Sequence, residues 1–191
     1  MKIHHELRAS LGAILGEELL EDPADLAHFG KDRCKGGWSI APAAVVRPGS
    51  VQDLQDVVAA CHRHDTPMVP SGGRTGLAGA AAATNGEVVV SLERLNRVHD
   101  IDVASRRMRV DAGVTLEQAQ LAAAEHGLLY PVDYAAKGTA QIGGSIATNA
   151  GGVKVLRYGL TREWVAGMDV VLADGSLLEL TGELDKNNTG Y

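Results

Sequence analysis

Two glycine-rich segments are the first feature of the sequence that points to chemistry. They occupy residues 69–79 and 141–152. Glycine leaves the neighbouring backbone N–H groups unshielded, and successive N–H groups in a turn form a concave nest that suits an anion such as a pyrophosphate. Gly72, Gly73 and Gly76 also permit close approach of the backbone to a ligand. The first segment matches neither the Walker A motif nor Gly-x-Gly-x-x-Gly. By itself, a tight surface loop explains it equally well.

The second segment is more specific. Gly143 and Gly144 let the backbone pass close to a flat or charged ligand, and the amide of Asn149 can both donate and accept hydrogen bonds, as the pyrimidine edge of a flavin requires. The competing interpretation is close packing of a helix on a strand through the glycines. Because both segments occur in one chain, and residues 131–133 (Pro-Val-Asp) precede the second, we favour the cofactor interpretation.

The net charge excludes one class of partner. The 191 residues include 18 basic and 24 acidic ones, which gives a formal net charge of −6. Nucleic-acid binding needs a concentrated basic surface instead. A bound phosphate would therefore be held by backbone amides and a few basic groups. The candidates are Arg74 and Lys137, followed by Lys154 and Arg157.

The cysteines and the N-terminus indicate the compartment. Cys34 and Cys61 match neither a metal-ligand spacing nor a secreted disulfide framework, so we expect two free thiols in the cytoplasm. The first residues lack the apolar run of a signal peptide. No stretch approaches the roughly 18 apolar residues of a membrane-spanning helix, so we expect no transmembrane segment.

The histidines predict no metal site. His62 and His64 are two positions apart on an expected helix and would point to different faces. His4 and His5 lie near the chain start, where we expect them to be solvated.

Hydrophobic spacing and turn signals predict a mixed α+β order. Capping boxes at Ser50 and Thr115 start two of the expected helices, and Gly127 ends the second of them. We expect helices over residues 6–20, from 51, over 115–127 and over 139–149, and strands over 43–47, 67–70, 87–91, 97–102, 107–111, 165–173 and 176–181.

Three regions follow from this order. Residues 1–40 are expected to form an N-terminal helical segment, residues 41–90 a first α/β lobe, and residues 91–191 a second, incomplete α+β lobe. The boundary between the lobes is expected near residues 84–100.

Several of these motifs together resemble those of a known protein family. The chain resembles the FAD-binding domain of the p-cresol methylhydroxylase/vanillyl-alcohol oxidase flavoproteins. Within that family it is most similar to the FAD-linked D-2-hydroxy-acid dehydrogenases, the group of D-lactate dehydrogenase, glycolate oxidase and D-2-hydroxyglutarate dehydrogenase. The residues that carry the resemblance are 69–77, 110–113, 131–133, 142–144, 147–152, 157–159 and 188–191.

The resemblance implies a two-lobed FAD-binding domain that is truncated before a cap domain. It implies that residues 71–77 hold the pyrophosphate and that residues of the second segment, with Asp133, line the ribityl and isoalloxazine part. Some relatives attach FAD through a histidine in the first loop, which is absent here, so we expect non-covalent FAD. The expected cofactor-binding residues are Pro70, Ser71, Gly72, Gly73, Arg74, Thr75, Gly76, Leu77, Pro131, Asp133, Thr139, Gly143, Gly144, Ser145, Ala147, Asn149, Gly151 and Gly152.

The resemblance also implies a reaction, in which a D-2-hydroxy acid is oxidised to a 2-oxo acid by hydride transfer to flavin N5. It places the proton-abstracting base outside this chain, so no catalytic residue is expected within it. The implied partners are a small hydroxy acid and a protein or quinone that accepts electrons. Whether the chain forms a homo-oligomer is left open. Two alternatives also remain: a same-fold flavoenzyme of other chemistry, such as UDP-N-acetylenolpyruvoylglucosamine reductase or a molybdenum-hydroxylase flavin subunit, and a non-catalytic FAD-binding module.

Overall fold

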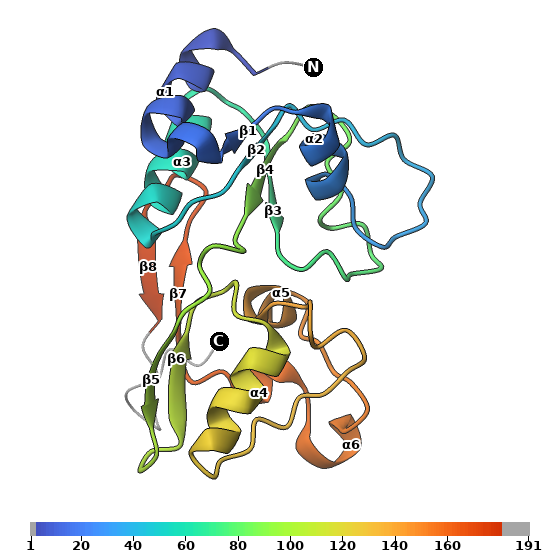
Figure 1. Cartoon of the computed structure of the whole chain (residues 1–191), viewed down its shortest axis with the longest axis vertical. Coiled ribbons are helices and arrows are strands. Elements are labelled where there is room, and N and C mark those ends of the chain that lie inside the picture. The colour runs from blue at the N-terminus through green and yellow to red at the C-terminus, as the bar shows by residue number, and fades with distance from the viewer. Residues whose placement is uncertain (1–2, 181–191) are drawn as a thin grey trace.

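The computed structural model describes residues 3–180. Figure 1 shows two groups of elements along the long axis, one built around strands β1 to β4 and one that contains helices α4, α5 and α6. The expected motif over residues 188–191 and the last residue of the expected strand 176–181 lie outside the described residues. Within the described range, no helix is long and apolar enough to cross a membrane.

The first group is organised by a four-stranded sheet. Its strands are β1 (Leu19–Leu20), β2 (Ala44–Val46), β3 (Met68–Ser71) and β4 (Val88–Ser91), in the spatial order β1-β2-β4-β3. Strands β2, β4 and β3 are parallel, whereas β1 pairs antiparallel with β2. Every residue of β4 is buried, as is typical of a central parallel strand. The carboxyl ends of the three parallel strands therefore share one edge of the sheet.

Helices α1 (His5–Leu15) and α3 (Val51–Arg63) cover this sheet. The buried residues Leu7 and Leu11 of α1 share one hydrophobic cluster with Val57 and Cys61 of α3 and with strands β2 and β4. Helix α3 starts as predicted, because the Ser50 side chain accepts a hydrogen bond from the Asp53 N–H. Cysteines 34 and 61 are both unpaired, as expected.

The prediction of one helix through residue 20 was wrong beyond residue 15. Gly16 has φ +56°, a left-handed conformation that ends α1, and the short 3-10 helix η1 (Gly16–Glu18) follows. Leu19 and Leu20 then pair with β2. Helix α2 (Pro23–Phe29) was not predicted, although Asp22 caps it and proline occupies its first position.

The second group holds strands β5 (Val98–Asp102) and β6 (Arg107–Val110), which pair antiparallel. Helix α4 (Leu116–Glu125) has the predicted capping box between Thr115 and Gln118, and Gly127 beyond its end has φ +69°. Helix α5 (Ile142–Ala147) is shorter than expected, and α6 (Val155–Tyr158) and the 3-10 helix η2 (Thr161–Trp164) were not predicted.

The predicted hairpin forms between β7 (Met168–Val171) and β8 (Leu177–Leu180). Its turn rests on α3, because the Gly175 carbonyl oxygen accepts a hydrogen bond of 3.1 Å from the Gln55 side chain. Asp169 of β7 also forms a 2.8 Å ion pair with Arg109 of β6. The hairpin therefore contacts elements of both groups (Figure 1).

Candidate FAD-binding site

The loop that follows β3 is the centre of the candidate site. Strand β3 ends at the fully buried Ser71, and the chain continues through the first glycine-rich segment. The backbone N–H groups from Gly72 to Leu77 donate no hydrogen bond to any residue in the range 3–180. Six successive donors without acceptors form the kind of nest that binds a phosphate group. The expected phosphate cradle thus has the hydrogen-bonding capacity that the role requires.

The structure brings the two glycine-rich segments into direct contact. A Cβ on Gly73 would overlap the carbonyl oxygen of Thr139 and would lie 2.7 Å from its carbonyl carbon. A Cβ on Gly72 would lie 3.1 Å from the side-chain oxygen of Gln141, the N-cap residue of α5. Gly73 is therefore needed to let the first loop pack on the backbone just before the second segment, and Gly72 leaves room for the Gln141 side chain.

Three buried polar atoms lack hydrogen-bond partners near this contact. They are the Oγ atoms of Ser71 and Ser91 and the Oε1 atom of Gln141. Ser71 and Ser91 are paired neighbours at the ends of β3 and β4, and Gln141 packs against Gly72. A buried polar atom without a partner costs free energy unless a bound group satisfies it. These atoms are therefore free to accept or donate hydrogen bonds to a polar ligand.

Ser91 and Gln141 were missed by the sequence analysis. Ser91 closes a strand of three valines, and a serine at the carboxyl end of a buried parallel strand is a recognisable signal for a ligand site. No such signal exists for Gln141, because its position beside Gly72 depends on tertiary packing.

The second segment uses most of its polar groups internally. The Gly143 N–H donates to the Ala112 carbonyl oxygen at 2.8 Å, and a Cβ on Gly143 would meet the Ala112 side chain. The buried Ser145 hydroxyl lies 2.6 Å from the Tyr134 hydroxyl and donates to the Gln141 carbonyl oxygen. Gly144, in contrast, is exposed and faces open space. Both earlier interpretations of this segment thus have support: close packing at Gly143 and accessibility at Gly144.

The end of this segment is fixed by unusual backbone conformations. Asn149 has φ +48°, and its side-chain oxygen accepts a hydrogen bond of 3.0 Å from the Arg162 N–H. Gly152 has φ +126°, and a Cβ there would overlap the Asp133 carbonyl oxygen. The second of these constraints places Gly152 beside Asp133, another residue expected at the cofactor.

The Arg74 side chain contacts other residues of the protein instead of pointing into open space. It has φ +54°, its guanidinium donates to the Gly72 carbonyl oxygen at 3.2 Å, and it lies 3.0 Å from the His28 ring nitrogen. The same group lies over the Phe29 ring, 4.7 Å from its centroid. Burial lowers the pKa of Arg74 below its ordinary value, and the Glu93 charge opposes that shift. This arrangement braces the loop against α2.

Two of the other basic candidates pair with Asp133, and the third stacks on a tyrosine. Lys154 lies 3.1 Å and Lys137 3.8 Å from the Asp133 carboxylate. The hydrogen bond from Lys154 is the main reason that the pKa of Asp133 lies below its ordinary value. Arg157 lies over the ring of Tyr158.

The remaining expected residues differ in accessibility. Gly76 faces open space, Pro70 and Ala147 are exposed, and the Leu77 side chain is 75% exposed. Thr75 and Gly151 are half-buried, Thr139 is exposed beside Gly73, and Pro131 is fully buried. The roles of all these residues in cofactor binding stay predictions.

Comparison with known proteins decides the family. The family model described as "FAD binding domain" matches residues 42–181. The chain belongs to this family. The resemblance stated from the sequence is thereby confirmed, and the residues present fit the cofactor: a run of free amides, unpartnered buried polar atoms, and open space at Gly76 and Gly144.

Among the relatives named D-2-hydroxyglutarate dehydrogenase, two are identical to this chain at about half of the aligned residues. The protein of Xanthomonas citri pv. viticola is 52% identical over 94% of this chain and 38% of its own length. That of Stutzerimonas stutzeri is 49% identical over 91% of this chain and 37% of its own length. The chain thus spans little more than a third of these relatives.

Solved structures confirm the fold class. p-Cresol methylhydroxylase matches with a TM-score of 0.77 and 25% identity, over 96% of this chain and 36% of that chain. An alkyldihydroxyacetonephosphate synthase matches with a TM-score of 0.87 and 20% identity, over 98% of this chain and 37% of that chain. The expected α+β FAD-binding domain of the p-cresol methylhydroxylase type is therefore correct.

Proposed function

We propose that this chain is the FAD-binding portion of a flavin-dependent dehydrogenase that oxidises a D-2-hydroxy acid to a 2-oxo acid. The names of the two relatives at 52% and 49% identity favour D-2-hydroxyglutarate as the substrate. A relative named D-lactate dehydrogenase, from Anaerostipes hadrus, is 36% identical, which makes D-lactate the second choice. When bound, FAD would supply the hydride acceptor for this oxidation.

The observation that carries the proposal is the run of free amides from Gly72 to Leu77. These donors would hold the pyrophosphate of FAD at the carboxyl end of β3. The Oγ atoms of Ser71 and Ser91 would supply further hydrogen bonds below the loop. The accessible backbone at Gly144 would lie along the flavin part. No histidine occurs in the first loop, which supports non-covalent attachment.

The remaining assignments belong to the same proposal. The base that removes the substrate hydroxyl proton would lie outside this chain, and a protein or quinone would accept the electrons. Two unpaired cysteines support a location in the cytoplasm. Under this proposal, the isolated chain loaded with FAD is not reduced by D-2-hydroxyglutarate, and bleaching of its flavin absorption would place the base within the chain.

The central test is the substitution Gly76→Leu. Gly76 is exposed, and no heavy atom lies within 4 Å of the position of an added Cβ. The side chain should therefore leave folding intact while it fills the space of the phosphate. We expect the free energy of unfolding to stay within about 0.5 kcal/mol of wild type. FAD retention should be lost, as read from the flavin absorption after reconstitution and desalting.

Ala124→Leu is the matched control, because it places the same leucine side chain at an exposed position of α4. It should retain FAD. Acid precipitation of the loaded wild type should release the flavin into the supernatant, as non-covalent attachment requires. Unchanged FAD affinity in Gly76→Leu would refute the cradle assignment.

A further inference from the structure

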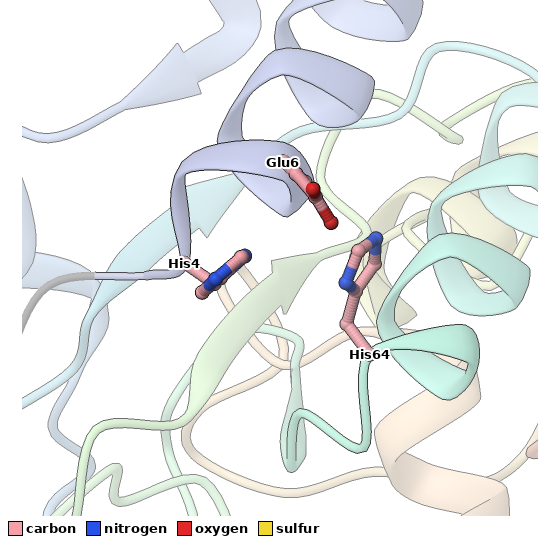
Figure 2. Close-up of side chains that lie close together, drawn as sticks. All are labelled: His4, Glu6 and His64. Atoms are coloured by element: carbon pink, nitrogen blue, oxygen red, sulfur yellow. The ribbon is translucent and has the colours of Figure 1, made fainter.

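Three side chains that lie away from the candidate FAD site converge where helix α1 begins and α3 ends. They are His4, Glu6 and His64, and one ligand atom from each lies within 4.8 Å of the others. Figure 2 shows the two imidazole rings and the carboxylate gathered around one space. We propose that this group binds a divalent first-row transition-metal ion, with Zn²⁺ as the best match.

The donor atoms select this class of ion. Two imidazoles and one carboxylate form a ligand set that Zn²⁺ accepts, with a fourth position left for water. Mg²⁺ and Ca²⁺ prefer ligand sets made of oxygen atoms, so they suit this group poorly. The ligands of a tetrahedral Zn²⁺ site lie about 3.4 Å apart at bond lengths near 2.1 Å. Small rotations of the exposed His4 and Glu6 side chains and the half-buried His64 side chain would bring the three atoms from within 4.8 Å to that spacing.

The backbone under these ligands is held in place. The His4 carbonyl oxygen accepts a hydrogen bond from the Arg8 N–H at 2.9 Å, at the start of α1. The His64 N–H donates to the Cys61 carbonyl oxygen at 3.2 Å, and its own carbonyl oxygen accepts from the Thr66 hydroxyl. The two helices that carry the group share one buried hydrophobic cluster. Only the side chains must move when the metal binds.

The three side chains are also free to bind a metal ion. Among residues 3–180, the side chains of His4, Glu6 and His64 have no hydrogen-bond or ion-pair partner. The His4 and His64 rings stack on each other, with 6.1 Å between their centroids. No hydrogen bond or ion pair among the described residues has to be broken before a metal binds.

Helix geometry explains how His4 and Glu6 meet although they are two positions apart. Side chains at that spacing inside a helix point to different faces. His4 is the N-cap residue with ψ 144°, outside the helical conformation, so this rule does not separate it from Glu6. His64 joins them because α3 packs on α1. The expectation of solvated N-terminal histidines treated each residue alone, and this proposal replaces it.

The test uses the full chain without a polyhistidine tag, since a tag would bind the metal itself. Zn²⁺ titration by calorimetry should give one ion per chain. At Zn²⁺ concentrations a hundred-fold above the Kd, the Tm should rise by about 5–10 °C. His64→Ala and Glu6→Gln should each weaken the affinity at least about ten-fold, a range typical of the loss of one metal ligand or its support.

His62→Ala and His5→Ala are the matched controls, because both residues are exposed neighbours that lie outside the group. They should retain the affinity of wild type. Glu6→Gln decides the matter if His64→Ala fails to fold, because it removes one charge and keeps the shape of an exposed side chain. Absence of Zn²⁺ binding, full affinity in Glu6→Gln, or an equal loss in the controls would overturn the proposal.

Discussion

The contact between the two glycine-rich segments makes Gly73→Ala the most informative perturbation of the fold. The substitution adds one methyl group, which would overlap the Thr139 carbonyl oxygen and lie 2.7 Å from its carbonyl carbon and 3.0 Å from the Ala140 Cα. Carbon atoms pack favourably at about 3.5–4.0 Å. The two backbones would therefore have to separate by about 1 Å.

The expected loss in free energy of unfolding depends on which atoms the added methyl group contacts. Overpacking of a well-packed interior costs about 1–3 kcal/mol. Gly73 faces backbone atoms, which cannot rotate away as a flexible side chain would. We therefore expect a loss near the upper end of that range in the free energy of unfolding, measured by urea denaturation with linear extrapolation. FAD affinity should fall as well, because the loop shifts relative to Gln141.

Gly12→Ala is the control for this measurement. Gly12 lies within α1, and its added Cβ would make only an ordinary contact of 4.0 Å with the Leu19 side chain. We expect it to stabilise the chain by about 0.5–1 kcal/mol, because alanine loses less conformational entropy in a helix. If Gly73→Ala instead unfolds within about 0.5 kcal/mol of wild type, the two segments do not pack as described and the reasoning fails.

Three further measurements test single features. Burial raises the pKa of the Cys61 thiol to about 11, so native protein at pH 8 should be alkylated only at the half-buried Cys34, and modification of both thiols without denaturant would contradict this. Ser71→Ala removes a buried hydroxyl that has no partner, so the FAD-free chain should unfold with unchanged or higher free energy while FAD binds more weakly; equal FAD affinity would remove Ser71 from the site. Lys154→Met should raise the pKa of Asp133 toward its usual value near 3.9 in an NMR titration. Because the wild-type pKa is depressed, its contribution to stability is present above that value and lost as pH falls through the folded pKa, so the variant should lose less stability on acidification.

Much of the architecture could be predicted from local patterns. The capping residues Ser50 and Thr115 start their helices as expected, and Gly175 occupies the predicted hairpin turn with φ +90°. These features depend on a few adjacent residues, whose hydrogen bonds are made within the same segment. The end of α1 was predicted too late, because helical spacing of leucines continues to Leu19 while the conformation of Gly16 and pairing with β2 end the helix earlier.

What the sequence by itself determined is the family, the α+β class and the glycine-rich loop after β3, because each depends on residue types at short spacing. Only the tertiary structure decided which groups meet. It placed Gly73 against Thr139, left Ser91 and Gln141 buried without partners, and brought His64 to His4. The physical reason is that these neighbours are distant in the chain. Burial of shared apolar surface between whole elements, such as α1 and α3, sets their positions, and no local pattern encodes that geometry.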